Sequence, residues 1–324
     1  MPELKYWQAI RSALRDEMAR DERVLVLGED VAQPGGPFGA TKGLLDEFGP
    51  SRVRDTPISE AAIMGAALGA AMTGLRPVAE IMFLDFMTLA ADQLVNQAAK
   101  VSWMSGGRFH VPLVVRTICG NRRGTGPQHA QSLEAWLAHV PGLKVVWPSS
   151  PGDAYGLLKT AIRDDDPVVV VESLALWGSR GPVDEGADVP LGTAAVRQPG
   201  GDLTVAAWGA TVPVALDAAR HLADEGIGVE VVDVRSISPL DEATILASVA
   251  KTGRLVVVHD AVSPAGVGAE IAALAAGQGF DTLRAPVVRV TAPFAPVPFA
   301  KHLETAYYPQ ADDVVAAARR VLER

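Results

Sequence analysis

Glu60 is the residue whose surroundings most directly suggest chemistry. It lies in the stretch DTPISEAAIMGAALGAAMTGLRP (55–77), in which no other charge follows it before Arg76. Pro57 favours an extended segment and Ser59 can cap a helix, so Glu60 falls in a first helical turn, where the helix dipole favours an anion. A carboxyl group enclosed by apolar surface can stay protonated or share a proton, which suits a hydrogen bond to a ring nitrogen of a heterocycle. The alternative interpretation is that Glu60 only completes the start of the helix.

A sheet of buried parallel strands would have to position this residue. The predicted strands of the first half are VLVLGED (24–30), RPVAEIMF (76–83), VPLVVRT (111–117), LKVVWP (143–148) and PVVVVES (167–173). Between them, helical patterns occupy 59–74, 87–103, 131–139 and 152–163. This alternation indicates an α/β fold with a doubly wound parallel sheet. The helix that Glu60 opens is rich in Ala and Gly on every face, which suits close burial, and it follows a strand end, where such sheets place ligands.

The same rhythm restarts in the second half of the chain. Residues 178–202 are rich in Gly, Pro and Asp, which is typical of a connection between domains. Further strands are predicted at 203–209, 229–235, 254–260 and 285–291, with helices near 212–225, 241–250 and 266–277. We therefore expect a first domain at 1–185, a linker at 186–202 and a smaller α/β domain at 203–324.

Composition narrows the class of protein. A chain of 324 residues, 48% hydrophobic and 21% charged, is long enough for two soluble domains. Its net charge of −9 argues against nucleic-acid binding. Cys119 is the single cysteine, so an internal disulfide is excluded. We expect Cys119 to be a small buried residue. The longest uncharged apolar stretch, 61–75, is shorter than the roughly 20 residues that span a bilayer, and the N-terminal segment mixes acids and bases, so we expect a cytoplasmic location.

The Gly-rich segments do not match a nucleotide-binding fingerprint. The sequence contains neither a G-x-G-x-x-G turn after a strand nor a G-x-x-x-x-G-K-[ST] motif. VSPAGVGAEIAALAA (262–276) follows a strand and opens a helix, so it could present backbone N–H groups to a phosphate. Tight helix packing at a domain interface is the favoured interpretation of that segment. A nucleotide-binding electron-transfer subunit therefore remains only an alternative.

Several long blocks of the sequence carry a family resemblance. They are DTPISE, EIMFLDF (80–86), AADQLVNQAAK (90–100), PQHAQSLEAW (127–136), PGLKVVWPSSPGDAYGLLKTAIRDDDPVVVVE (141–172) and TAPFAPVPFAKHLE (291–304). In this order and over essentially the whole chain, they resemble the β subunit of the E1 component of 2-oxo acid dehydrogenase complexes. That family is thiamine diphosphate-dependent and transketolase-like, and includes pyruvate, acetoin and branched-chain 2-oxo acid dehydrogenases.

The resemblance implies roles for four residues. Glu60 matches the glutamate that hydrogen-bonds N1′ of the cofactor's aminopyrimidine and helps that ring to remove the thiazolium C2 proton. Phe86 matches the aromatic residue that stacks on the pyrimidine, although an ordinary core position is its alternative. His129 matches a histidine near the substrate and the incoming lipoyl group, where imidazole can move protons. Glu29 matches a glutamate near the pyrimidine, with a capping or packing role as the alternative.

The resemblance also implies a structural potassium ion. The matching positions are Leu113, Ala161, Ile162, Asp164 and Asp166. Carbonyl and carboxylate oxygens suit a hard cation. A solvated acidic turn is the alternative, and an aspartate at 166 can alter the coordination.

The sequence lacks one half of a thiamine diphosphate site. No Gly-Asp-Gly turn, which would hold Mg²⁺ and the diphosphate, occurs anywhere in the chain. The resemblance therefore implies that an E1 α subunit supplies this half, that the assembly is an α2β2 heterotetramer, and that the chain alone is inactive. It also implies contacts of the second domain with the subunit-binding domain of E2, and of the active site with the E2 lipoyl domain.

Two further alternative functions stay open at this point, together with the choice of substrate. A split transketolase-type enzyme has the same pair of domains, but the PQHAQSLEAW block favours E1 β. A non-catalytic partner would not need Glu60, Phe86 and His129 together. For the substrate, the closing block favours pyruvate or acetoin over branched-chain 2-oxo acids, although a methyl or two in a pocket is worth only about 1–3 kcal/mol.

Overall fold

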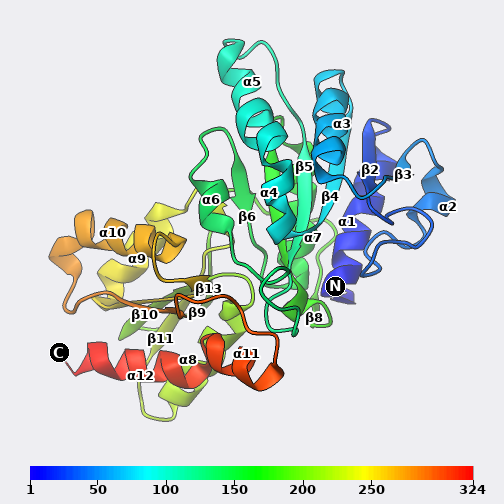
Figure 1. Cartoon of the computed structure of the whole chain (residues 1–324). Helices are drawn as coiled ribbons and strands as arrows, with labels where there is room; N and C mark the ends of the chain where they lie inside the picture. The colour runs from blue at the N-terminus through cyan, green and yellow to red at the C-terminus, as the bar shows by residue number, and fades with distance from the viewer. Residues whose placement is uncertain (324) are drawn as a thin grey trace.

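The chain folds into two α/β halves, each built around its own sheet (Figure 1). The structure, a computed structural model, describes residues 1–323. The first sheet has seven strands. In spatial order they are β12 (Ser236–Ser238), β6 (Lys144–Val146), β7 (Val168–Ser173), β5 (Val114–Cys119), β4 (Arg76–Phe83), β2 (Val24–Gly28) and β3 (Val53–Asp55). Six of these strands run parallel, and only β12 is antiparallel, to β6.

Helices cover both faces of the first sheet, as a doubly wound fold requires (Figure 1). One core contains the apolar faces of α1 (Tyr6–Arg20) and α7 (Pro151–Arg163), which pack against each other. The other core contains α3 (Glu60–Met72), α4 (Met87–Ala91), the π-helix η2 (Asp92–Ala98), α5 (Ala99–Met104) and α6 (Glu134–Ala138). The helix expected over 87–103 is therefore present but contains a π-helical segment, a feature that is frequent at functional sites.

The second half carries a five-stranded sheet. Its spatial order is β14 (Val288–Ala292), β13 (Leu255–Val262), β10 (Leu203–Ala207), β11 (Val229–Asp233) and β9 (Ala195–Gln198). Helices α8 (Thr211–Ala223) and α12 (Ala311–Leu322) share one core with this sheet. Helices α9 (Glu242–Thr252) and α10 (Val267–Gly277) join the core that continues into the first half. The predicted α/β class holds for both halves.

The halves exchange strands at their junction. β12 lies in the second half of the chain but pairs with β6 of the first sheet. The segment expected to be a linker, 186–202, contains β9, which pairs antiparallel with β11. Just before it, β8 (Arg180–Pro182) pairs with β1 (Glu3–Lys5). The segment between the halves is thus partly ordered into strands.

Charged side chains reinforce this junction. Asp153 at the start of α7 accepts a hydrogen bond from Arg235 (2.8 Å) and forms an ion pair with Arg197. Arg197 also donates to the buried Asp233 at the end of β11 (2.8 Å). Two arginines of the second half therefore converge on one carboxylate of the first. Among residues 1–323, no helix is both long and apolar enough to cross a membrane.

Candidate active site

Four neighbouring strands of the first sheet end at the same edge, and the predicted site residues follow those ends. β5, β4, β2 and β3 are adjacent and parallel. Glu29 comes directly after β2, and Glu60 follows β3 by a short extended segment. Phe86 follows β4, and His129 lies in the loop after β5. The fold thus collects all four at the edge where open α/β sheets bind ligands.

The two glutamates are close enough for their charges to interact. Burial raises the pKa of Glu29 above its ordinary value, and the negative charges of Asp30 and Glu60 add to this rise. Asp55 at the end of β3 fixes the turn after β2, because its carboxylate accepts a hydrogen bond from the backbone N–H of Ala32 (2.6 Å). Glu29 and Glu60 therefore lie near each other at the ends of β2 and β3.

Glu60 opens α3 as the sequence predicts, but its surroundings differ in two ways. Ser59 occupies the predicted cap position, but its side chain makes no hydrogen bond to the first turn of the helix. Glu60 is half-buried rather than enclosed. Only one face of α3 is buried within this chain, and the small residues of its other face, including Ala61 and Ala62, are exposed together with Ile58 (76%) just before it. The predicted apolar crevice is therefore closed on one side only.

An aromatic group surrounds the imidazole of His129. Its ring meets Phe86 edge-on, with centroids 5.3 Å apart, and meets Phe83 at 4.9 Å. Phe83 in turn contacts Phe38 edge-on at 5.8 Å. Phe86 is half-buried and packs against the cores on both faces of the sheet. The structure therefore brings the predicted aromatic residue and the predicted histidine into direct contact.

Two residues that the sequence analysis did not single out support this contact. Phe83 lies closer to His129 than Phe86 does. Asp85 is buried, and its carboxylate accepts hydrogen bonds from the backbone N–H (3.2 Å) and the side-chain amide (2.8 Å) of Gln131. Burial raises the pKa of Asp85. Both residues lie within EIMFLDF, the same motif that predicts Phe86, so that motif carries the signal for all three residues.

The positions expected to bind potassium lie around the turn after α7. They are Leu113, Ala161, Ile162, Asp164 and Asp166. Arg76 donates to the main-chain oxygens of Ile162 (2.8 Å) and Asp164 (2.5 Å). Lys144 contacts the carboxylates of Asp164 (2.8 Å) and Asp166 (3.1 Å). Two cationic side chains therefore already bind this turn, although each carbonyl oxygen keeps a second lone pair that a cation could use.

The Gly-rich segment that opens α10 packs tightly against His259, in agreement with the favoured interpretation of tight helix packing. A Cβ on Gly268 would lie 2.4 Å from Nε2 of His259, so only glycine fits there. His259 is fully buried and stacks on Trp208, with centroids 5.1 Å apart. Cys119 is likewise fully buried, and burial raises the pKa of its thiol. Neither His259 nor Cys119 is one of the aromatic group around His129 that contains Phe83 and Phe86.

Two buried ionisable groups lie at the junction of the halves. Among the described residues, Glu134 on α6 has no hydrogen-bond partner for either carboxylate oxygen, and His259 on β13 has none for either ring nitrogen. Burial raises the pKa of Glu134 to about 7, and the charge of Asp260 adds to this effect. Burial lowers the pKa of His259 to about 4, although the charge of Asp260 opposes that fall. Both groups therefore favour their uncharged forms.

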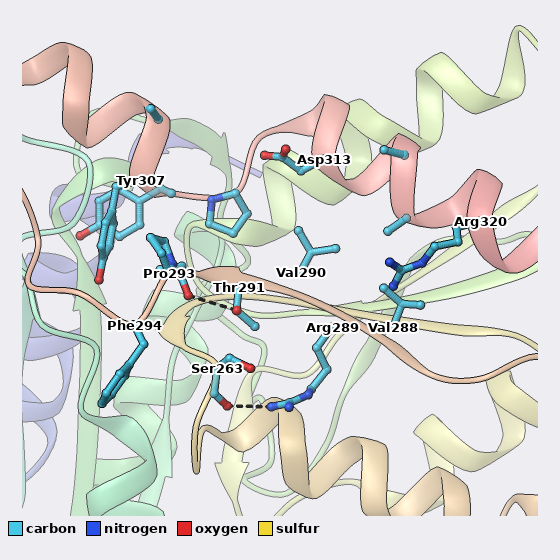
Figure 2. A pocket seen from close by; sticks show the side chains of 16 residues that line it. Ser263, Val288, Arg289, Val290, Thr291, Pro293, Phe294, Tyr307, Asp313 and Arg320 are labelled. Carbon is cyan, nitrogen blue, oxygen red and sulfur yellow. Dashed lines mark hydrogen bonds between the residues drawn. The ribbon is translucent and has the colours of Figure 1, made fainter.

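A hollow of about 720 Å³ lies in the second half, between β14 and the C-terminal helices, and Figure 2 shows the side chains that line it. Arg289 and Arg320 lie at one end of it, and Arg289 donates to the main-chain oxygen of Ser263 (2.7 Å). Phe294 and Tyr307 lie at the other end. None of the residues predicted to carry chemistry lines this hollow.

Comparisons with known families match nearly the whole chain. The profile described as the transketolase pyrimidine binding domain matches residues 2–177. The profile described as the transketolase C-terminal domain matches residues 192–314. The first match contains all four residues gathered at the sheet edge.

Individual relatives are similar over almost their full length. The chain is 46% identical to subunit beta-2 of the mitochondrial pyruvate dehydrogenase E1 component of Oryza sativa subsp. japonica, covering 99% of this chain and 87% of that protein. It is also 46% identical to the beta subunit of acetoin:2,6-dichlorophenolindophenol oxidoreductase of Bacillus subtilis, covering 97% and 96%. The Drosophila melanogaster pyruvate dehydrogenase E1 beta subunit is 48% identical over 97% of this chain and 88% of that protein.

Solved structures agree in fold. A split gene transketolase, described as an inactive beta4 tetramer, superposes with a TM-score of 0.81 at 23% identity, covering 98% of this chain and 97% of that chain. Transketolase from Leishmania mexicana gives a TM-score of 0.72 at 20% identity, covering all of this chain and 46% of that one. At these identities the similarity concerns the arrangement of the elements alone.

Proposed function

Because the chain belongs to the family of E1 β subunits of 2-oxo acid dehydrogenase complexes, we propose that it supplies the pyrimidine half of a thiamine diphosphate site and works together with an α subunit. The observation that carries this proposal is the edge of the first sheet. There, four adjacent strand ends present Glu60, Glu29, Phe86 and His129. Two carboxyls, an aromatic surface and an imidazole are the groups that a protonatable heterocycle and a carbonyl substrate require.

Each residue has a proposed task at this edge. Thiamine diphosphate, when bound, supplies the carbanion chemistry that side chains lack. Glu60 would hold a proton at its carboxylate, toward a ring nitrogen of the bound pyrimidine. Glu29, whose pKa is raised by burial and by Asp30 and Glu60, shares that proton. Phe86 provides a flat apolar surface, and His129 moves or holds a proton during acyl transfer to lipoamide.

We place the diphosphate and Mg²⁺ on the α subunit. The chain has no Gly-Asp-Gly turn to hold them, and burying a diphosphate without a cation would be very costly. The exposed small-residue face of α3 beside Glu60 leaves room for a partner to close the site. The expected assembly is α2β2, with E2 binding the second half of the chain. The cytoplasmic location also stays a prediction, since relatives include mitochondrial proteins.

Potassium at the turn after α7 belongs to the same proposal. If the carbonyls of Leu113, Ala161 and Ile162 bind it together with the carboxylate of Asp166, KCl will raise the melting temperature more than an equal concentration of NaCl. The variant Asp166→Ala should lose this difference. An equal effect of the two salts on the parent chain would remove potassium from the account.

The assay for the whole proposal is reconstitution with the α subunit. The complex, with thiamine diphosphate and Mg²⁺, should reduce 2,6-dichlorophenolindophenol with pyruvate or acetoin at a higher kcat/KM than with branched-chain 2-oxo acids. Relatives of the pyruvate and acetoin types are equally similar, so the assay has to rank those two. Transfer of ketol units between sugars without 2-oxo acid oxidation would favour the split transketolase alternative instead.

A further inference from the structure

The loop that carries His129 is held by the second half of the chain. This loop, residues 121–130, follows β5 and makes hydrogen bonds to residues of the second half. At its start, Asn121 donates to the carboxylate of Asp260 (2.6 Å) and Arg122 forms an ion pair with it (2.6 Å). Asp260 lies on β13 and is buried. A buried carboxylate with two charge-assisted or amide donors fixes the beginning of the loop firmly.

The middle and the end of this loop are held by helix α11 (Lys301–Tyr307) and by Tyr308, the residue that follows the helix. The backbone N–H of Gly124 donates to both carboxylate oxygens of Glu304 (3.0 and 2.9 Å). Glu304 is only 4% exposed. The hydroxyl of Tyr308 donates to the main-chain oxygen of Ala130, the residue after His129 (3.2 Å). Glu304 closes TAPFAPVPFAKHLE, a block that the proposed active site does not otherwise use.

Within the loop, two hydrogen bonds connect the backbone that is held in this way to His129. Its main-chain oxygen accepts from the backbone N–H of Gly120 (3.0 Å) and from the hydroxyl of Thr125 (3.3 Å). A Cβ on Gly120 would lie 2.1 Å from that same oxygen, so the two ends of the loop are in close contact. Thr125 is adjacent to the residue that Glu304 binds. A displacement at Gly124 therefore moves the backbone that holds the imidazole.

We infer that Glu304 and Asp260 are positioning residues of the active site: they clamp the loop so that His129 stays against Phe83 and Phe86. This inference rests on the proposed role of His129 in acyl transfer. It gives the second half of the chain a part in catalysis in addition to its contacts with other subunits. Glu304 and Asp260 hydrogen-bond to the loop and not to the rings of Phe83 and Phe86. They therefore act on the site through the position of His129.

The test compares Glu304→Ala with Glu304→Gln in the reconstituted complex. The amide oxygen of Gln can still accept from Gly124, whereas Ala removes both hydrogen bonds. Misplacement of a catalytic group by about 1 Å can cost up to about 100-fold in rate. We expect Glu304→Ala to lower kcat for acylation of the E2 lipoyl domain about 10- to 100-fold, with KM for the 2-oxo acid and the Kd of thiamine diphosphate within about twofold. Glu304→Gln should restore kcat to within about threefold of the parent enzyme.

Val314→Ala is the matched control, because it creates a cavity in the core of the second half without touching the loop. A merely structural role for Glu304 predicts that kcat falls with the melting temperature in both variants. Equal kcat losses in Glu304→Ala and Val314→Ala at equal destabilisation would overturn the inference. Unchanged acylation kcat in both Glu304→Ala and Asp260→Ala would overturn it as well.

Hydrogen–deuterium exchange separates this inference from the proposed function. Glu304→Ala should speed exchange in the peptide covering 120–130, and Glu304→Gln should not. If the parent complex oxidises no 2-oxo acid or acetoin, the proposed function fails, whatever the exchange shows. If the parent complex is active but exchange at 120–130 is the same in all variants, the clamp fails and the proposed function stands.

Discussion

The rings of Phe86 and His129 lie edge-to-face with their centroids 5.3 Å apart, although 43 positions separate them in the chain. Phe86 follows β4 and His129 follows β5, and these strands are parallel neighbours. Glu29 and Glu60 are brought together in the same way by β2 and β3. The site is therefore a property of strand order, and each residue at this edge can be tested separately.

Glu60→Gln should abolish most turnover without unfolding the protein. The substitution keeps the shape of the side chain but removes the group proposed to exchange a proton, and such groups contribute about 10²–10⁴-fold to rates. Glu60 is half-buried, so we expect little change in melting temperature. Dye reduction by the reconstituted complex measures the loss, and the exposed Glu22→Gln serves as the control. Full activity of Glu60→Gln in an intact assembly would reject the assignment.

His129→Asn should separate two steps of the reaction. If His129 acts mainly in acyl transfer, acylation of the lipoyl domain should fall by at least about tenfold more than dye-coupled oxidation of the 2-oxo acid. His221→Asn, at an exposed position on α8, should change neither rate. Equal losses in the two assays would show instead that His129 acts before the acyl group is transferred.

Glu134 and His259 should give the stability of the protein two opposing pH dependences. The pKa of Glu134 is raised from its ordinary 4.5 to about 7. At pH values between these two, folded Glu134 keeps a proton that the unfolded chain releases, so stability falls as pH rises through this window. The pKa of His259 is lowered from its ordinary 6.5 to about 4. At pH values between these two, folded His259 stays neutral while the unfolded chain binds a proton there, so stability falls as pH is lowered. The charges of Asp260 and Arg289 act on these groups but do not reverse either direction. Each effect amounts to about 3 kcal/mol, and they nearly cancel between pH 4.5 and 6.5.

Single substitutions should reveal the pH dependence of stability that each group contributes. Relative to the parent chain, Glu134→Gln should become more stable as pH rises from 4.5 to 7, and its own stability should increase with pH below 6.5. His259→Asn should show the opposite slope. Denaturant unfolding across this pH range measures both. Two variants with parallel pH profiles would contradict the assignment of these groups.

Arg116→Met should be among the most destabilising single changes in the first half. Arg116 is buried within the sheet, where it forms ion pairs with Glu172 (2.8 Å) and Glu80 (2.6 Å). Removal of the cation leaves two buried carboxyl groups without their partner, which costs about 3–5 kcal/mol. Arg15→Ala is the control, because the Arg15–Glu47 pair is exposed and exposed ion pairs contribute little to stability. A similar free energy of unfolding for both variants would show that the buried cluster is not needed for stability.

Local patterns predicted the elements better than they predicted the contacts between them. The run RPVAEIMF was expected to form a strand at 76–83 and does so as Arg76–Phe83, because a strand buried on both faces is apolar throughout. The helix expected at 152–163 is found as Pro151–Arg163. By contrast, β3 and β12 have three residues each, too few for a periodic pattern, and β12 depends on a partner in the other half.

The same division holds for the site. Glu60 and Phe86 could be named because each stands in a recognisable local motif. The contact of Glu304 with Gly124 spans 180 positions and involves a backbone N–H, so no side-chain pattern announces it. The π-helix of η2 was also not foreseen, since its composition reads as ordinary helix. What the sequence could not supply is the pairing of distant segments across the junction.

The most direct test of the central claim is calorimetric titration of thiamine diphosphate and Mg²⁺. It should be made on the isolated chain and then on the chain combined with its α subunit. A site shared between two subunits predicts no measurable binding to the isolated chain and tight binding to the combined subunits, with binding weakened by Glu60→Gln. Tight binding to the isolated chain would mean that it carries its own diphosphate site, and the account of a half-site completed by a partner would be wrong.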